Sequence, residues 1–76
     1  MMKKYYSLYD FAEDNNYRAA SMVTSDDKYY IAYCTSTHLW HVGTYSHCKD
    51  TYNVELSDIL TFPTREQATL AILTLL

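Results

Sequence analysis

Residues 64–76 read TREQATLAILTLL, and this stretch decides the fold because it carries the strongest helix signal in the chain. Thr64 is a good helix N-cap, and Gln67 three residues later completes a capping box. Pro63 precedes the cap, where it fixes the entry of the chain. Apolar residues then recur at spacings of three and four, which predicts a stripe that packs on the rest of the chain. The residues of this stripe are Ala68, Ala71, Ile72, Leu75 and Leu76.

Two further leucines, Leu70 and Leu73, lie off the stripe and widen the apolar face of this helix. A helix that is apolar over so much of its surface can also bind a partner or a membrane. The run is too short to span a bilayer, and it has no basic face with which to lie on one. We therefore expect a core helix.

The residues before the closing helix predict a β-sheet. Residues 28–35, KYYIAYCT, are rich in β-branched and aromatic side chains and form the clearest strand. Residues 38–45 alternate, so that Trp40 and Val42 face one side while His41 and Tyr45 face the other. Residues 17–24 alternate more weakly. Ser7 followed by Asp10 resembles a capping pattern and predicts a short helix at 8–15.

The remaining segments are less regular. Residues 46–53 are polar and predict a loop, and residues 54–60 fit either a strand or a helical turn. The predicted fold is therefore a single α+β domain over residues 1–76. It has a three- or four-stranded antiparallel sheet packed against a C-terminal helix, with a short N-terminal helix or strand.

Composition excludes several classes of function. The 76 residues carry a net charge of −3, with 6 basic and 9 acidic residues. Direct nucleic-acid binding through phosphate neutralisation needs clustered Lys and Arg, which this chain lacks. The sequence also lacks a nucleophile-elbow pattern, a phosphate loop and a dinucleotide fingerprint. We predict a protein that is not an enzyme and that holds neither cofactor nor metal.

Tyrosine is the compositional outlier, with nine residues among the 76. Each buried phenol needs a hydrogen-bond partner, so we expect some of these side chains to lie on the surface and to bind another protein. The alternative is that aromatic strands pack in pairs across the sheet. The predicted contact residues are exposed tyrosines of the sheet and nearby carboxylates suited to a basic partner, namely Tyr29, Tyr30, Tyr33, Tyr45, Asp26 and Asp27.

One segment contains residue types that bind metals or respond to redox state. It comprises Cys34, His38, His41, His47 and Cys48. Alternation places His38 and His41 on opposite faces of one strand, and the Cys-x2-Cys pair typical of zinc sites is missing. A Cys34–Cys48 disulfide is geometrically feasible if the loop after Tyr45 folds back. A small metal- or redox-responsive domain therefore stays open as an alternative function.

In general character the chain is similar to small accessory proteins of bacteriophages and mobile elements, being short, acidic and tyrosine-rich without a catalytic signature. Such proteins, the anti-CRISPR proteins among them, often inhibit a host or defence complex by occupying its surface. This similarity implies a protein-binding inhibitor, with a partner that is basic or itself binds nucleic acid. We expect a cytoplasmic location, in the host if the gene is carried by a phage. A homodimer formed by edge-strand pairing, or a self-associating structural subunit, is the remaining alternative.

Overall fold

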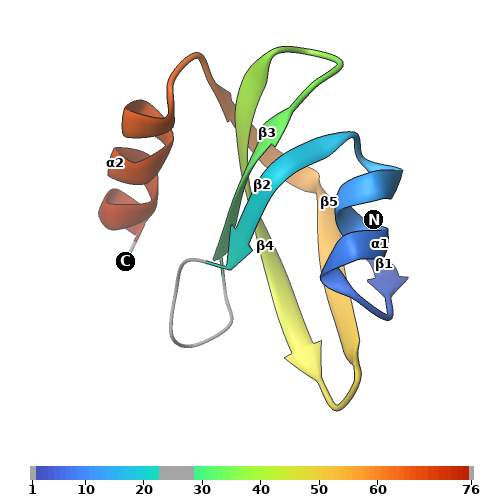
Figure 1. Ribbon diagram of the computed structural model, residues 1–76. Coiled ribbons are helices and arrows are strands. Elements are labelled where there is room, and N and C mark those ends of the chain that lie inside the picture. The colour runs from blue at the N-terminus through green and yellow to red at the C-terminus, as the bar shows by residue number, and fades with distance from the viewer. Residues whose placement is uncertain (1, 23–28, 76) are drawn as a thin grey trace.

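The computed structural model describes residues 2–22 and 29–75 and is an α+β fold with one five-stranded antiparallel sheet (Figure 1). The strands lie in the order β1-β5-β4-β3-β2. The elements in chain order are β1 (Met2–Tyr5), α1 (Leu8–Asp14), β2 (Tyr17–Met22), β3 (Tyr29–Cys34), β4 (Leu39–Cys48), β5 (Thr51–Phe62) and α2 (Arg65–Leu75).

The predicted α+β class and the closing helix are confirmed, but the sheet has five strands where three or four were expected. The fifth strand is β1, in the segment where a short helix or strand was expected. Residues 46–53, which were predicted to form a loop, lengthen β4 and β5. β4 runs on to Cys48, a short turn follows, and β5 starts at Thr51. Lys49 in this turn has a φ of 56°, a left-handed conformation that usually falls to Gly or Asn. The usual turn signal is therefore missing from the sequence.

Both faces of the sheet are covered, each by one helix. Figure 1 shows α1 and α2 on opposite sides of the sheet. Because side chains alternate along β3, Tyr30, Ala32 and Cys34 pack on the α1 side, while Tyr29 and Ile31 pack on the α2 side. The sheet consequently separates two hydrophobic cores.

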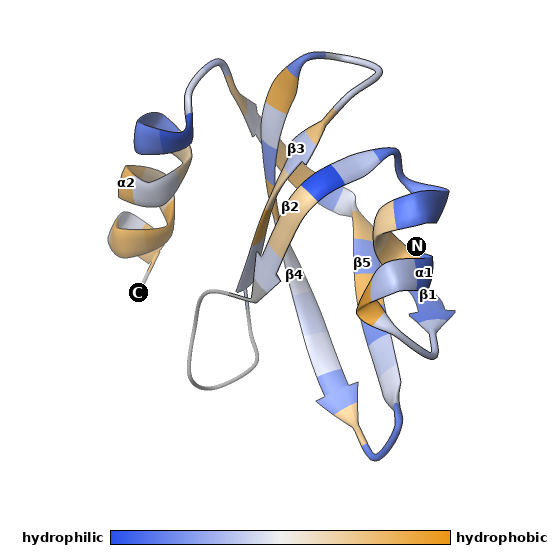
Figure 2. Cartoon of the chain, in the orientation of Figure 1, coloured by the Kyte–Doolittle hydropathy of each residue, from blue (hydrophilic) through white to orange (hydrophobic). Residues whose placement is uncertain are grey.

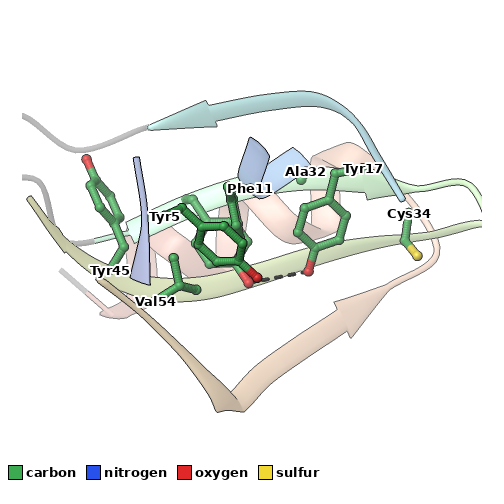
Figure 3. Packing of buried hydrophobic residues seen from close by; sticks show 8 residues of the cluster. Tyr5, Phe11, Tyr17, Ala32, Cys34, Tyr45 and Val54 are labelled. Carbon is green, nitrogen blue, oxygen red and sulfur yellow. Dashed lines mark hydrogen bonds between the residues drawn. The ribbon is translucent and has the colours of Figure 1, made fainter. Parts of the chain in front are cut away.

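The core beneath α1 is largely aromatic (Figure 3). Phe11 of α1 is fully buried, and its ring lies 4.9–5.4 Å, centroid to centroid, from three tyrosine rings at edge-on angles. Edge-to-face contacts of this kind add to the free energy gained by burying apolar area. The buried residues of this core are Tyr5, Phe11, Tyr17, Tyr30, Ala32, Cys34, Tyr45 and Val54.

The core beneath α2 is smaller. Ala68 and Ile72 of the helix are buried against Ile31 and Val42, so this part of the predicted apolar stripe faces the sheet. Leu75 was also expected in the stripe but is 48% exposed, and Leu76 lies outside the described residues. Thr64 acts as the predicted N-cap, since its hydroxyl accepts a 3.2 Å hydrogen bond from the backbone N–H of Gln67. Among residues 2–22 and 29–75, no helix has the length and apolar composition needed to cross a bilayer.

The two edge strands are poorly suited to pairing with another sheet. β1 has only four residues, two of which are Lys3 and Lys4. β2 is interrupted between Arg18 and Ser21, where Ala19 has a φ of 52°. Short, charged and bulged edges resist edge-to-edge association. This geometry argues against a homodimer formed by strand pairing.

Candidate partner-binding surface

Three of the predicted contact tyrosines are buried. The exposed fractions are 7% for Tyr29, 0% for Tyr30 and 5% for Tyr45. The expectation that these residues face solvent is wrong, because α1 covers the sheet face that was expected to be open. Tyr29 lies in the other core, beneath α2. These three side chains fit the alternative, in which aromatic residues of the strands pack within the chain.

Tyr33 is the predicted contact residue that keeps part of its surface open. It lies half-buried on the α2 side of the sheet, directly across from Arg18 on one neighbouring strand and from Trp40 on the other. Its ring centroid is 5.4 Å from that of Trp40, and its hydroxyl is 3.2 Å from Nδ1 of His38. The two predicted carboxylates, Asp26 and Asp27, lie outside the described residues.

The Cys/His segment is not gathered into one site. Cys34 is buried beside the β3–β4 turn, whereas His47 and Cys48 lie at the far end of β4, and both thiols are free. Within the described parts of the chain, no group of three or more His, Cys, Asp or Glu side chains is placed to hold a metal ion. The segment as folded therefore does not assemble the ligand set of the metal alternative.

His41 takes part in a chain of hydrogen bonds between strands. Its Nδ1 lies 3.0 Å from the Tyr17 hydroxyl. That hydroxyl in turn lies 3.4 Å from the Tyr30 hydroxyl, a contact drawn as the dashed line at Tyr17 in Figure 3. Its Nε2 lies 3.3 Å from the Thr37 hydroxyl. Burial lowers the pKa of His41, which favours the neutral ring. These contacts join β2, β3 and β4 and give the buried hydroxyls of Tyr17 and Tyr30 hydrogen-bond partners.

The most exposed tyrosines lie instead around α1. Tyr6 is 72% exposed and Tyr9 is 74% exposed, the two highest values among the large apolar side chains described. Asp10 and Glu13 are exposed beside them. A hydrogen bond to the Glu13 carboxylate raises the pKa of Tyr9, which places these two side chains together one helical turn apart. We call Tyr6, Tyr9, Asp10 and Glu13 the α1 patch.

Contacts at both ends of α1 hold the α1 patch in place. Ser7 is the predicted N-cap and accepts a 3.1 Å hydrogen bond from the backbone N–H of Asp10. At the other end, Asp14 accepts hydrogen bonds of 2.6 Å from Lys3 and 2.7 Å from the Tyr5 hydroxyl. These two donors lower the pKa of Asp14. The short helix is thereby fastened to β1, and its outer face is fixed relative to the sheet.

An open hollow of about 560 Å³ lies between β1 and α1. Asp14 is neutralised there by Lys3, while the exposed carboxylates of Asp10 and Glu13 border the same space. The residues that line the hollow are Lys3, Lys4, Tyr5, Asp10, Glu13 and Asp14. The lining therefore carries three carboxylates and two lysines, one of which pairs with Asp14.

Part of this surface can be predicted from local spacing in the sequence. Tyr6 and Tyr9 stand near Asp10 and Glu13 in the chain, and helical spacing predicts one acidic face on α1. The missing step was that both faces of the sheet are covered, so that Tyr30 and Tyr45 lie beneath α1 and Tyr29 lies beneath α2. Tyr6 and Tyr9 stay outside. Comparisons of this chain with protein-family models, with curated proteins and with solved structures give no match.

Proposed function

We propose that this protein is a non-enzymatic protein-binding module whose α1 patch docks on a basic surface of another protein. The observation that carries the proposal is the placement of Tyr6 and Tyr9, both more than 70% exposed, beside the exposed carboxylates of Asp10 and Glu13. Tyrosine gives a large contact area at low entropic cost, and carboxylates steer the approach of a cationic partner.

The hollow beside α1 suits a Lys or Arg side chain of the partner. The exposed carboxylates of Asp10 and Glu13 would receive the cationic group, since they outnumber Lys4, the lysine of the lining that does not pair with Asp14. The exposed rings of Tyr6 and Tyr9 would contact its aliphatic stem. Arg binds carboxylates with a planar, bidentate fork, so an Arg-rich surface is the better match. Such surfaces are common on proteins that bind nucleic acids.

Occupation of such a surface would exclude its normal ligand, and we therefore propose that the protein acts as an inhibitor of a host or defence complex. Its small size and acidic charge fit this role, because a compact acidic domain can cover a basic site without catalysis of its own. The similarity in character to phage-encoded inhibitors supports this part of the proposal.

Affinity capture from lysate of the native host tests the binding surface. The charge-reversal variant Asp10→Lys/Glu13→Lys should lose the captured partner, and Tyr6→Ser/Tyr9→Ser should weaken capture about tenfold or more. The matched control is Asp50→Lys/Asp58→Lys, which makes the same change of charge at two exposed carboxylates away from α1. Thermal melting should show that all variants stay folded.

Two outcomes would count against the proposal. Retention of the partner by the α1 double variant would show that α1 is not the contact, and equal loss in the control would show that only net charge matters. Inhibition is tested separately by adding the purified protein to an activity assay of the captured partner. Binding without loss of that activity would indicate that the protein is an adaptor and not an inhibitor.

A further inference from the structure

One end of the sheet carries aromatic and basic side chains together on its α2 side. Tyr33 pairs with Arg18 on β2 and with Trp40 on β4, and paired residues of antiparallel strands point to the same face. Figure 1 shows the β3–β4 turn and the segment that leads into α2 at this same end of the sheet. Arg65, the first residue of α2, lies over Trp40, with its Cζ atom 5.7 Å from the ring centroid. We call Arg18, Tyr33, Trp40 and Arg65 the arginine row.

Both guanidinium groups of the arginine row are open to solvent. Arg18 and Arg65 are the two arginines of the chain, and both are exposed. In Figure 2 the start of β2 and the first turn of α2, which contain them, are strongly hydrophilic. Within residues 2–22 and 29–75 the ion pair is that of Lys3 with Asp14, which involves neither arginine. The two positive charges are therefore available to a ligand.

Local structure fixes both sides of the arginine row. β2 bulges directly after Arg18, where Ala19 has a φ of 52°, and bulges re-aim the side chains beside them. On the other side, the cation–π contact with Trp40 orients the guanidinium group of Arg65. The half-buried rings of Tyr33 and Trp40 lie between the two, with their centroids 5.4 Å apart. The row is thus an aromatic surface with a cation at each end.

The length of the arginine row indicates what it can bind. β2 and β4 are two strand spacings apart, so about 10 Å separates the backbone at Arg18 from that at Trp40, over which Arg65 lies. Residues two apart on an extended peptide point the same way and lie about 7 Å from one another. Two glutamate side chains in a Glu-x-Glu segment can thus reach both guanidinium groups, each of which binds a carboxylate as a planar fork. Their CH₂ groups would then lie on the two aromatic rings.

We propose that the arginine row binds a short acidic segment of another protein, held in an extended conformation through two of its carboxylates. Charge complementarity favours this class of ligand. A nucleic-acid strand fits less well, because it carries a phosphate at every nucleotide and would run past the row over a chain whose net charge is −3. A second copy also fits less well, since two copies carry the same net charge and repel each other.

The arginine row shares no residue with the α1 patch and lies on the other face of the sheet. This inference can therefore hold or fail independently of the proposed function. If both hold, the protein joins a basic partner on one face to an acidic partner on the other.

Titration of the full chain with a capped octapeptide of alternating Glu and Ala tests the proposal. Trp40 is the single tryptophan of the chain, so its fluorescence reports binding directly at the row. We expect saturation with a dissociation constant on the order of 0.1–1 mM, and about tenfold weaker binding of the same peptide with Gln in place of Glu. Raising the salt concentration from about 50 mM to about 300 mM should also weaken binding.

Variants of the row show which residues make the contact. Arg18→Gln and Arg65→Gln should each weaken peptide binding about threefold or more. The matched control is Lys49→Gln, which removes the same charge at an exposed residue of the β4–β5 turn and should leave the affinity unchanged. Thermal melting should show that all three variants stay folded, since each altered side chain is exposed.

Several results would overturn the proposal. One is the absence of a saturable change in Trp40 fluorescence, and another is equal binding of the Gln peptide. Equal weakening by Lys49→Gln would mean that only net charge matters. Tighter binding of an octameric single strand of thymidine would assign the row to nucleic acid. Sedimentation that shows self-association of the chain, lost in both Arg18→Gln and Tyr6→Ser/Tyr9→Ser, would assign it to the α1 patch of a second copy.

Discussion

Gly43 lies directly against the ring of Tyr30 on the neighbouring strand. The two residues are paired across β3 and β4, and a Cβ atom at Gly43 would stand 2.5 Å from both the hydroxyl oxygen and Cε2 of Tyr30. Tyr30 is fully buried, so its ring has no free space into which it can move. The missing side chain at position 43 is therefore what lets the ring of Tyr30 pack directly against the backbone of β4.

Gly43→Ala should accordingly destabilise the protein by about 1–3 kcal/mol, the usual cost of overpacking a core. Urea unfolding followed by fluorescence of Trp40 measures this free energy. Ser46→Ala, at an exposed position of the same strand, should change it by less than about 0.5 kcal/mol. Combining Gly43→Ala with Tyr30→Val should cost less than the sum of the two changes, because the smaller side chain removes the clash. Strict additivity would show that the ring is not the obstacle.

Phe11 is the residue on which the attachment of α1 depends most. Its ring is fully buried and contacts the rings of Tyr5, Tyr17 and Tyr30. Phe11→Ala should cost about 3–5 kcal/mol, since it removes the apolar area and leaves a cavity among the three rings. Phe11→Leu should cost clearly less. A loss below about 1 kcal/mol for the alanine variant, measured by the same urea titration, would mean that α1 contributes little to stability.

Stability should fall as the pH drops below about 6.5, and His41 should be one cause. Burial lowers the pKa of His41 in the folded state, so the unfolded chain binds the proton more readily. The stabilisation is complete above the unfolded pKa and is lost as the pH falls towards the folded pKa. The lowered pKa of Asp14 acts in a separate window, because it removes stability only below its ordinary value of 3.8.

Unfolding free energies measured at several pH values between 5 and 8 check this dependence. The variant His41→Gln, which keeps a polar side chain near Tyr17, should show a smaller decrease over this range. An unchanged pH profile in the variant would remove His41 as the source. A histidine that is harder to protonate in the folded state lowers stability at acidic pH, because the unfolded state then binds more protons.

The two thiols should react at very different rates. Cys48 is exposed, whereas Cys34 is 3% exposed, so a thiol reagent should label one cysteine quickly and the second only on unfolding. Burial raises the pKa of Cys34, but hydrogen bonds from Ser36 and Thr37 outweigh it and bring that pKa to about 7. The Cys34 thiolate therefore forms near neutral pH, but its burial keeps reagents away from the sulfur. Fast labelling of the Cys48→Ser variant in its native state would contradict this explanation.

Much of the fold follows from local patterns in the sequence. Local spacing predicts the caps at Ser7 and Thr64 and the stripe that contains Ala68 and Ile72. Each of these features depends on neighbours within one or two helical turns. The faces of Trp40 and Val42 also followed from simple alternation.

The sequence does not predict the full length of β5, and the reason is physical. Between the pair Val42–Leu60 and the pair Thr44–Glu55 the register shifts, so residues 56–59 bulge out and the alternation of β5 breaks in its middle. The two halves of the strand then place apolar residues on different faces of the sheet, Val54 towards α1 and Phe62 towards α2. A bulge of this size is a property of the paired strands and leaves no local pattern.

The location of the candidate site also depends on contacts between residues that are far apart in the sequence. The excess of tyrosine correctly predicted exposed phenols, but which phenols stay outside depends on where α1 lies. Tyr30 and Tyr9 are chemically alike, and only the packing of Phe11 on the sheet makes one of them core and the other surface.

β3 belongs to both hydrophobic cores at once, and this gives it a role that neither helix has. Five of its six side chains are buried, some under α1 and the others under α2. β4 and β5 also place side chains in both cores, so the two layers share three strands and should melt together as one cooperative unit. A ligand that binds the folded protein at the α1 patch should therefore stabilise the layer beneath α2 as well.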